Sequence, residues 1–89
     1  MDDRDFVLTI HEVFTIPGRG TVVVGTVESG VLRGGQTVGV WAGDHLIATT
    51  PAWFELIWRP DHPRRLSLLL SDVDRGVVGV GHIVRRSAG

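Results

Sequence analysis

The stretch Phe14-Thr-Ile-Pro-Gly-Arg-Gly-Thr-Val-Val-Val-Gly-Thr-Val-Glu-Ser-Gly30 contains a turn between two segments rich in β-branched residues. Pro17 fixes its own φ, while Gly18 and Gly20 accept the positive φ that a turn between antiparallel strands requires. We therefore expect a β-hairpin here. Gly25 interrupts the Val-rich second segment, which predicts a β-bulge or a close approach by another backbone or a ligand.

The segment before this turn, residues 6–14, has the period of two that is typical of a strand. Its alternation assigns two faces, one with Phe6, Leu8 and Ile10 and the other with Val7, Thr9, His11 and Val13. Turn residues separate further candidate strands at 21–28, 37–41, 46–50, 53–58, 66–70 and 77–84. Pro51 is expected to stop or kink the strand at 46–50.

These segments predict an all-β protein of six or seven short antiparallel strands. With 89 residues and 12 glycines, the chain has room for one compact domain whose corners are tight turns. A small closed barrel is favoured because closure removes exposed strand edges. We expect a single domain over 1–89, with an ordered barrel over 5–85 and short polar termini.

Composition excludes several classes of function. The chain has no cysteine, and all nine of its basic residues are arginine, so disulfides, thiolate metal sites, a Walker-type phosphate loop and a lysine Schiff base are all absent. The net charge of -1 predicts that any contact with nucleic acid is local. The polar start and the short apolar runs predict no secretion signal and no membrane span, and the cytoplasm is the expected location.

The sequence contains few residue patterns that are typical of catalytic sites. The histidines His11, His45, His62 and His82 lack the spacing with which two imidazoles share a zinc ion. No serine lies in a nucleophile-elbow sequence, and the Asp44-His45 and Asp61-His62 pairs are interpreted as solvated loop residues. The sequence therefore predicts a protein that is not an enzyme, with no cofactor and no metal.

Three tryptophans, Trp41, Trp53 and Trp58, have two interpretations: they fill or cap the barrel, or they contact a ligand or another protein. Trp53 and Phe54 are neighbours on a predicted strand, so one should face inward and the other outward. Near Trp58, the residues Arg59, Arg64 and Arg65 form a small basic cluster. The alternative interpretation of that cluster is a solvated loop.

The stretch quoted first resembles the start of the second domain of elongation factor Tu and related translational GTPases, where the pattern is F-x-I-x-G-R-G-T-V-V-x-G-x-V-E-x-G. Twelve positions match, namely Phe14, Ile16, Gly18, Arg19, Gly20, Thr21, Val22, Val23, Gly25, Val27, Glu28 and Gly30. The similarity continues more loosely to Asp72-Val-Asp-Arg-Gly76 and is weak between Trp41 and Arg65. Domains of this type are six- or seven-stranded antiparallel barrels, in agreement with the strand count above.

In that family, the domain follows a GTPase domain, contacts the small ribosomal subunit and receives the terminal adenosine of aminoacyl-tRNA. The resemblance implies a pocket formed by Ile16, Gly18, Val22 and Leu69. An aliphatic surface stacks a base, and glycine allows close backbone approach. Arg19, which precedes Gly20, would lie at the loop tip, where its guanidinium would meet a phosphate.

The sequence departs from the family where a glutamate normally covers the other face of the adenine, which leaves Trp53 and Glu55 as the two candidates for that place. Barrel geometry alone also explains Gly18, Gly20 and Gly25 as turn and bulge residues.

The favoured hypothesis is a non-enzymatic translation elongation factor-like barrel, either standalone or excised, that takes part in protein biosynthesis. Its expected partners are RNA, as tRNA or the ribosome, or a GTPase-type domain, with no DNA and no membrane. The alternative is a protein–protein interaction module that keeps the barrel and has lost RNA binding.

Overall fold

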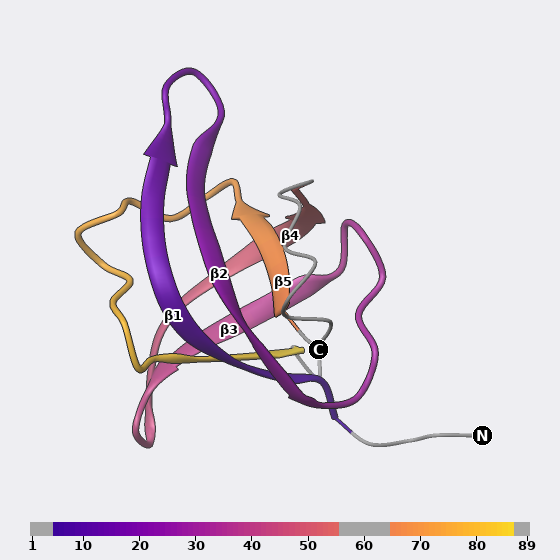
Figure 1. The fold of residues 1–89 in the computed structure, drawn as a ribbon. Coiled ribbons are helices and arrows are strands. Elements are labelled where there is room, and N and C mark those ends of the chain that lie inside the picture. Colours follow the sequence, from indigo (N-terminus) through magenta and orange to yellow (C-terminus); the bar gives the residue numbers. More distant parts are fainter. Residues whose placement is uncertain (1–4, 56–64, 87–89) are drawn as a thin grey trace.

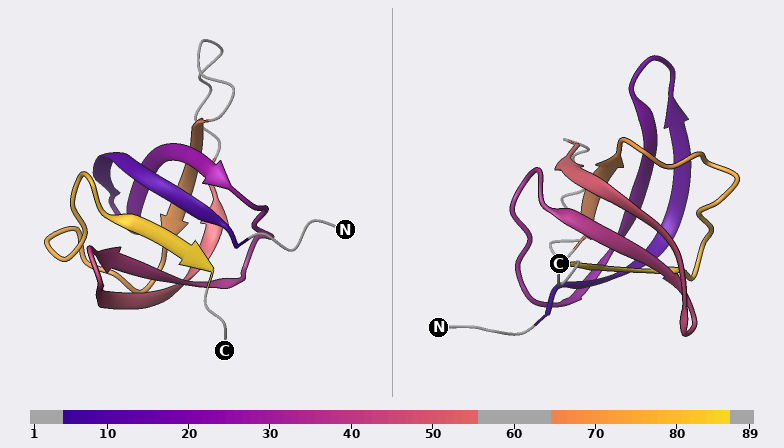
Figure 2. Two further views of the ribbon diagram at one scale, coloured as in Figure 1. Left: turned by 90° about the horizontal axis from the view of Figure 1, so that it is seen from below. Right: turned by 180° about the vertical axis from the view of Figure 1, so that it is seen from behind.

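The computed structural model describes residues 5–55 and 65–86. They form six strands: β1 (Val7–Ile16), β2 (Gly20–Ser29), β3 (Thr37–Ala42), β4 (His45–Phe54), β5 (Arg65–Leu70) and β6 (Ile83–Arg86). All pairings are antiparallel, and the order β1-β2-β5-β4-β3-β6 closes on itself through β1 and β6 (Figures 1 and 2). The predicted all-β closed barrel is confirmed.

The first strand begins with the predicted alternation and then changes phase. Phe6, Leu8 and Ile10, which the alternation places on one face, are all buried in the core. The register with β2 shifts by one residue between Ile10 and Glu12, which leaves an extra residue in β1. A bulge of this kind moves every later side chain to the other face. Val13, predicted to lie on the outer face, therefore packs against the core.

Gly25 lies where β2 approaches this irregular part of β1. A Cβ atom at Gly25 would be 2.2 Å from the carbonyl oxygen of Thr9 and 2.5 Å from a methyl carbon of Leu8. Only a residue without a side chain fits a space that backbone already occupies. The predicted close backbone approach at Gly25 is confirmed.

The sequence predicts that Pro51 stops or kinks its strand. The strand does not stop there, because β4 runs through Pro51 to Phe54. The neighbouring Ala52 uses both backbone groups on one side, donating to the carbonyl of Gln36 at 3.0 Å and accepting from the amide of Gly35 at 2.7 Å. Successive residues point their backbone groups to opposite sides, so the nitrogen of Pro51 points toward β5. The pairing of β4 with β5 ends at Ala52 and Leu70 and does not include Pro51. The proline therefore removes no ladder bond there.

The core is built from inward-facing aliphatic side chains of every strand, and Phe6 is the one buried aromatic ring among the described residues. Alternation separates it from the outer face: Val23 and Leu68 pair across β2 and β5 and belong to the core, while their neighbours Val22 and Leu69 do not. Trp41 and Trp53 are also outside the core. The interpretation that these two tryptophans fill the barrel is therefore wrong.

The bounds predicted for the last strand, 77–84, are also wrong, because the strand in this region, β6, is Ile83–Arg86. The preceding residues form turns, and two buried valines, Val73 and Val78, hold this segment to the core. The Thr21 hydroxyl donates a hydrogen bond of 2.7 Å to the carbonyl of Val73. Val78 thus anchors a turn to the core, while Val77 and Val80 are exposed, and a strand-period pattern cannot distinguish these roles from pairing.

Candidate functional site

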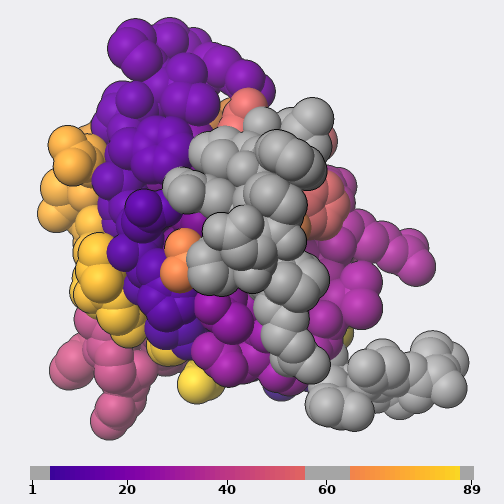
Figure 3. All heavy atoms as spheres, in the orientation of Figure 1, coloured from indigo at the N-terminus to yellow at the C-terminus, as the bar shows by residue number. Residues whose placement is uncertain are grey.

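The β1–β2 hairpin extends beyond the body of the barrel, and its tip carries the residues of the quoted motif (Figures 1 and 3). The Arg19 amide donates to the carbonyl of Ile16 at 3.0 Å, and Gly18 has a φ of 79°. Proline at the second position and a positive-φ glycine at the third are the signature of a type II turn. The predicted turn is confirmed, and it brings Ile16 opposite Gly20.

Beside this tip, three of the predicted site residues form one row across three strands. Val22 pairs with Leu69, and Leu69 pairs with Trp53. Directly opposed residues in antiparallel strands have side chains on the same face, which here is the outer face of the barrel. Val22 is nevertheless 0% exposed and Leu69 only 8%, whereas Trp53 is 48% exposed. We call the outer face at Val22 and Leu69 the covered wall.

Gly20 allows the hairpin base to lie close to this row. A Cβ atom at Gly20 would be 3.4 Å from a terminal methyl carbon of Leu69 and 3.3 Å from the carbonyl oxygen of Leu70, and its φ is 139°. The Leu69 side chain therefore lies where a side chain at position 20 would be. This is the close approach that glycine permits.

Arg19 reaches from the hairpin tip to Glu55, just after the end of β4. Its two terminal nitrogens lie 3.0 Å and 2.9 Å from the two carboxylate oxygens, a forked ion pair. The Glu55 side chain is 14% exposed, and its Oε2 atom is buried and has this ionic contact without a hydrogen bond of good geometry. The predicted phosphate ligand at the tip is thus already held by a carboxylate.

Trp53 lies over Gly35, where a Cβ atom would be 3.1 Å from the far edge of the indole ring. Phe54 contacts Gly34 in the same way, at 3.6 Å. Both aromatic side chains are about half exposed. The register agrees with the prediction that one of them faces inward and the other outward, because Phe54 pairs with the core residue Leu68 and Trp53 pairs with Leu69 on the outer face. The inward direction does not bury Phe54, which is 50% exposed at the end of β4.

The structure therefore gathers all eight predicted site residues at one end of the β1–β2 hairpin and the adjoining ends of β4 and β5, namely Ile16, Gly18, Arg19, Gly20, Val22, Trp53, Glu55 and Leu69. Glu55 and Trp53 are the two candidates to cover the other face of a bound adenine. Glu55 forms an ion pair with Arg19, and Trp53 lies in the row with Leu69. Trp58, Arg59 and Arg64 lie outside the described residues, while Arg65 begins β5.

The sequence is similar to that of a known protein over most of its length. The chain is 38% identical over 86 residues to Elongation factor Tu 2 of Streptomyces avermitilis, a match that covers 92% of this chain. The chain is a relative of elongation factor Tu. It spans 22% of the length of that protein. No family model matches the chain.

The likeness to elongation factor Tu confirms the resemblance inferred from the hairpin motif, and it concerns a β-barrel domain rather than the GTPase domain. Within 5–55 and 65–86, no group of three His, Asp or Glu side chains is placed to hold a metal ion. No helix that is long and apolar enough to cross a membrane occurs in the same part of the chain.

One feature of the outer surface escaped the sequence analysis. The guanidinium carbon of Arg85 lies 5.8 Å from the centroid of the Trp41 ring, a cation–π contact between β6 and β3. These residues are 44 positions apart in the chain, and their register through β3 and β6 depends on barrel closure. No local sequence signal indicates such a contact.

Proposed function

We propose that the chain is a non-enzymatic, translation elongation factor-like module that contacts RNA, either the 3′ end of aminoacyl-tRNA or the ribosome. A GTPase-type domain is the second kind of partner that the likeness to elongation factor Tu supports. The same likeness supports a location in the cytoplasm. The observation that carries the proposal is the single row of Val22, Leu69 and Trp53 beside the hairpin tip.

The chemistry of this row suits the terminal base of an RNA strand. Trp53 offers a half-exposed ring on which a base can stack, whereas Leu69 and Val22 are buried beside it and hold the row in place. Arg19 is 53% exposed, so its guanidinium can meet a phosphate while it remains near Glu55. A strand end needs few charges, which agrees with the net charge of -1.

The proposal is tested with two RNA hairpins that mimic an aminoacylated acceptor stem, one with and one without the terminal adenosine. We expect loss of the adenosine to weaken binding about tenfold, the effect of one stacked base. Trp53→Ala should remove this difference, and Arg19→Gln should weaken both RNAs. Arg75→Gln, at an exposed arginine outside this row, serves as the control of equal charge and should leave the difference intact.

Equal affinity for the two RNAs in the unaltered protein would refute recognition of the terminal adenosine at this row. Measuring at two salt concentrations separates the ring contribution from the phosphate contribution, because only the latter falls steeply with salt.

The alternative, a protein interaction module, is favoured by one observation: Trp53 and Phe54 together expose aromatic surface at the barrel rim. It is tested by titrating the chain with the GTPase domain of elongation factor Tu. A complex that weakens on Phe54→Ala but is unchanged by RNA would support it. A lack of any complex at high micromolar concentration would count against it.

A further inference from the structure

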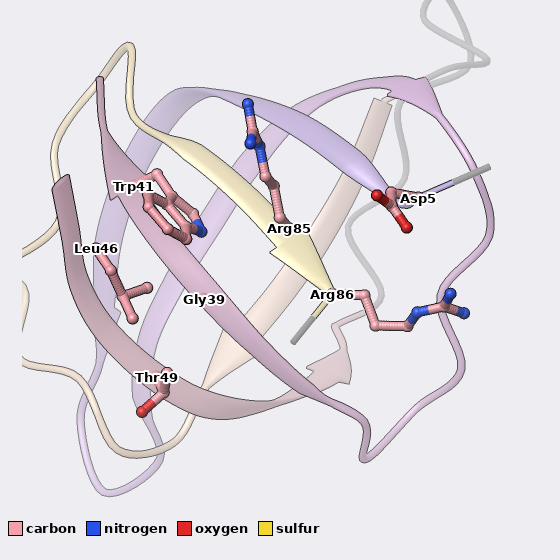
Figure 4. A pocket seen from close by; sticks show the side chains of 7 residues that line it. All are labelled: Asp5, Gly39, Trp41, Leu46, Thr49, Arg85 and Arg86. Atoms are coloured by element: carbon pink, nitrogen blue, oxygen red, sulfur yellow. The ribbon is translucent and has the colours of Figure 1, made fainter. Parts of the chain in front are cut away.

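On the opposite side of the barrel, the outer face of β3 and β6 contains a hollow of about 180 Å³ (Figure 4). Six of the residues that line it carry the argument: Asp5, Gly39, Trp41, Leu46, Arg85 and Arg86. In the ring order, β3 and β6 stand across from β2 and β5. We call this surface the open wall, and it shares no residue with the site proposed above.

The hollow exists because of Gly39 in the middle of β3. Gly39 pairs with Arg85 of β6 on one side and with Thr49 of β4 on the other, so the row has no side chain at its centre. A Cβ atom there would be 2.8 Å from a methyl carbon of Leu46 and 3.1 Å from the indole nitrogen of Trp41. An aliphatic and an aromatic side chain therefore border the hollow closely.

Three of the residues that line the hollow are charged. The exposed residues Arg85 and Arg86 bring two guanidinium groups, and Asp5 brings one carboxylate, so positive charge is in excess. The Arg85 guanidinium lies 5.8 Å from the Trp41 ring centroid, near the aromatic face and accessible to solvent. A ligand that suits both features has a flat ring for Trp41 and an anionic group for Arg85.

From this combination we propose that the open wall binds a nucleotide unit, its base against Trp41 and Leu46 and its phosphate at Arg85. Base stacking on an aromatic side chain and a forked guanidinium–phosphate contact are the two interactions involved. A free mononucleotide and a residue of single-stranded RNA share this chemistry. An acidic peptide suits the hollow less well, because a carboxylate can meet Arg85 but offers no flat ring for Trp41.

The experiment titrates the protein with AMP, with adenosine and with a short single-stranded oligoadenylate, and follows the indole N–H signals by NMR. The Trp41 signal is assigned by its loss in Trp41→Leu. We expect AMP to shift this signal and adenosine to bind about tenfold more weakly, since it lacks the charged group. Arg85→Gln should weaken AMP by a similar factor, and Arg75→Gln, an exposed arginine outside the hollow, should not.

Binding of AMP alone would indicate a free nucleotide, and tighter binding of the oligoadenylate would indicate an RNA strand. Absence of AMP binding at millimolar concentration would overturn the proposal. Equal affinity of Arg85→Gln and the unaltered protein would also overturn it, as would an acidic peptide that shifts the Trp41 signal at lower concentration than the oligoadenylate does.

The variant Trp53→Ala separates this inference from the function proposed above. AMP binding that survives Trp53→Ala and is lost in Trp41→Leu belongs to the open wall. AMP binding with the reverse dependence belongs to the hairpin surface, and it would refute this inference while leaving the proposed function intact.

Discussion

Outward-facing side chains are buried on the covered wall, at Val22 and Leu69 of β2 and β5, whereas on the open wall they surround a hollow at Gly39 of β3. Both walls belong to one barrel and both contain a glycine close to a leucine side chain. On the covered wall, Leu69 lies against the space above Gly20, and Arg19 is paired with Glu55. On the open wall, a hollow remains and a guanidinium faces an aromatic ring.

The difference shows that facing outward and being exposed are separate properties in a small barrel. Alternation along a strand decides which way a side chain points. Its exposure depends on what else packs against that face, as the burial of the outward-facing Val22 and Leu69 shows. The covered wall should therefore contribute to stability, while the open wall keeps its polar and aromatic groups available.

The largest expected effect contrasts a filled glycine site with an open one. Gly25→Ala places a methyl group against the Thr9 backbone, which cannot move without opening the β1–β2 pairing, so we expect a loss of about 3 kcal/mol or more in the free energy of unfolding. Gly39→Ala meets only the flexible end of Leu46 and the indole of Trp41, and should cost about 1 kcal/mol or less.

Urea denaturation measures both values, with Gly76→Ala as the control, because a Cβ atom at Gly76 meets nothing within 4 Å. Similar costs for Gly25→Ala and Gly39→Ala would contradict the distinction between a filled and an open glycine site.

A pair of leucine truncations compares the two walls directly. Leu69→Ala removes a buried side chain from the covered wall and should cost about 2–3 kcal/mol. Leu46→Ala removes one that is 50% exposed on the open wall and should cost about 1 kcal/mol or less. The two variants lose the same atoms, so their difference in thermal unfolding reports burial alone. Equal destabilisation would show that the covered wall has no special role in stability.

The smallest effect concerns the ion pair that closes the covered wall. A double-mutant cycle with Arg19→Gln and Glu55→Gln should give a coupling of about 0.5–1 kcal/mol, since the guanidinium is largely solvated while the carboxylate is not. The coupling should fall as salt is added, because the exposed side of the pair is screened. A coupling near zero at low salt would mean that Arg19 is held by the turn rather than by Glu55.

Local features of the fold were predictable from the sequence. The turn at Pro17 and Gly18 depends on the φ preferences of those two residues alone, and the burial of Phe6, Leu8 and Ile10 follows from alternation within one segment. The face of Val13 was not predictable in this way. The extra residue in β1 exists only relative to the paired strand β2, and it moved Val13 to the core face.

The site was predictable only through resemblance to elongation factor Tu, because Val22, Leu69 and Trp53 are far apart in sequence and meet through two strand registers. The pairing of Arg19 with Glu55 was missed, since nothing near either residue indicates the other.

The sequence by itself determined the strand-and-turn pattern, the all-β class, the absence of lysine and cysteine chemistry, and the hairpin motif shared with elongation factor Tu. Tertiary structure alone decided which outward side chains are covered, that β4 continues through Pro51, and that Arg85 lies over Trp41. The reason is that backbone preferences act between neighbouring residues, whereas register and closure are set by contacts between strands distant in the chain.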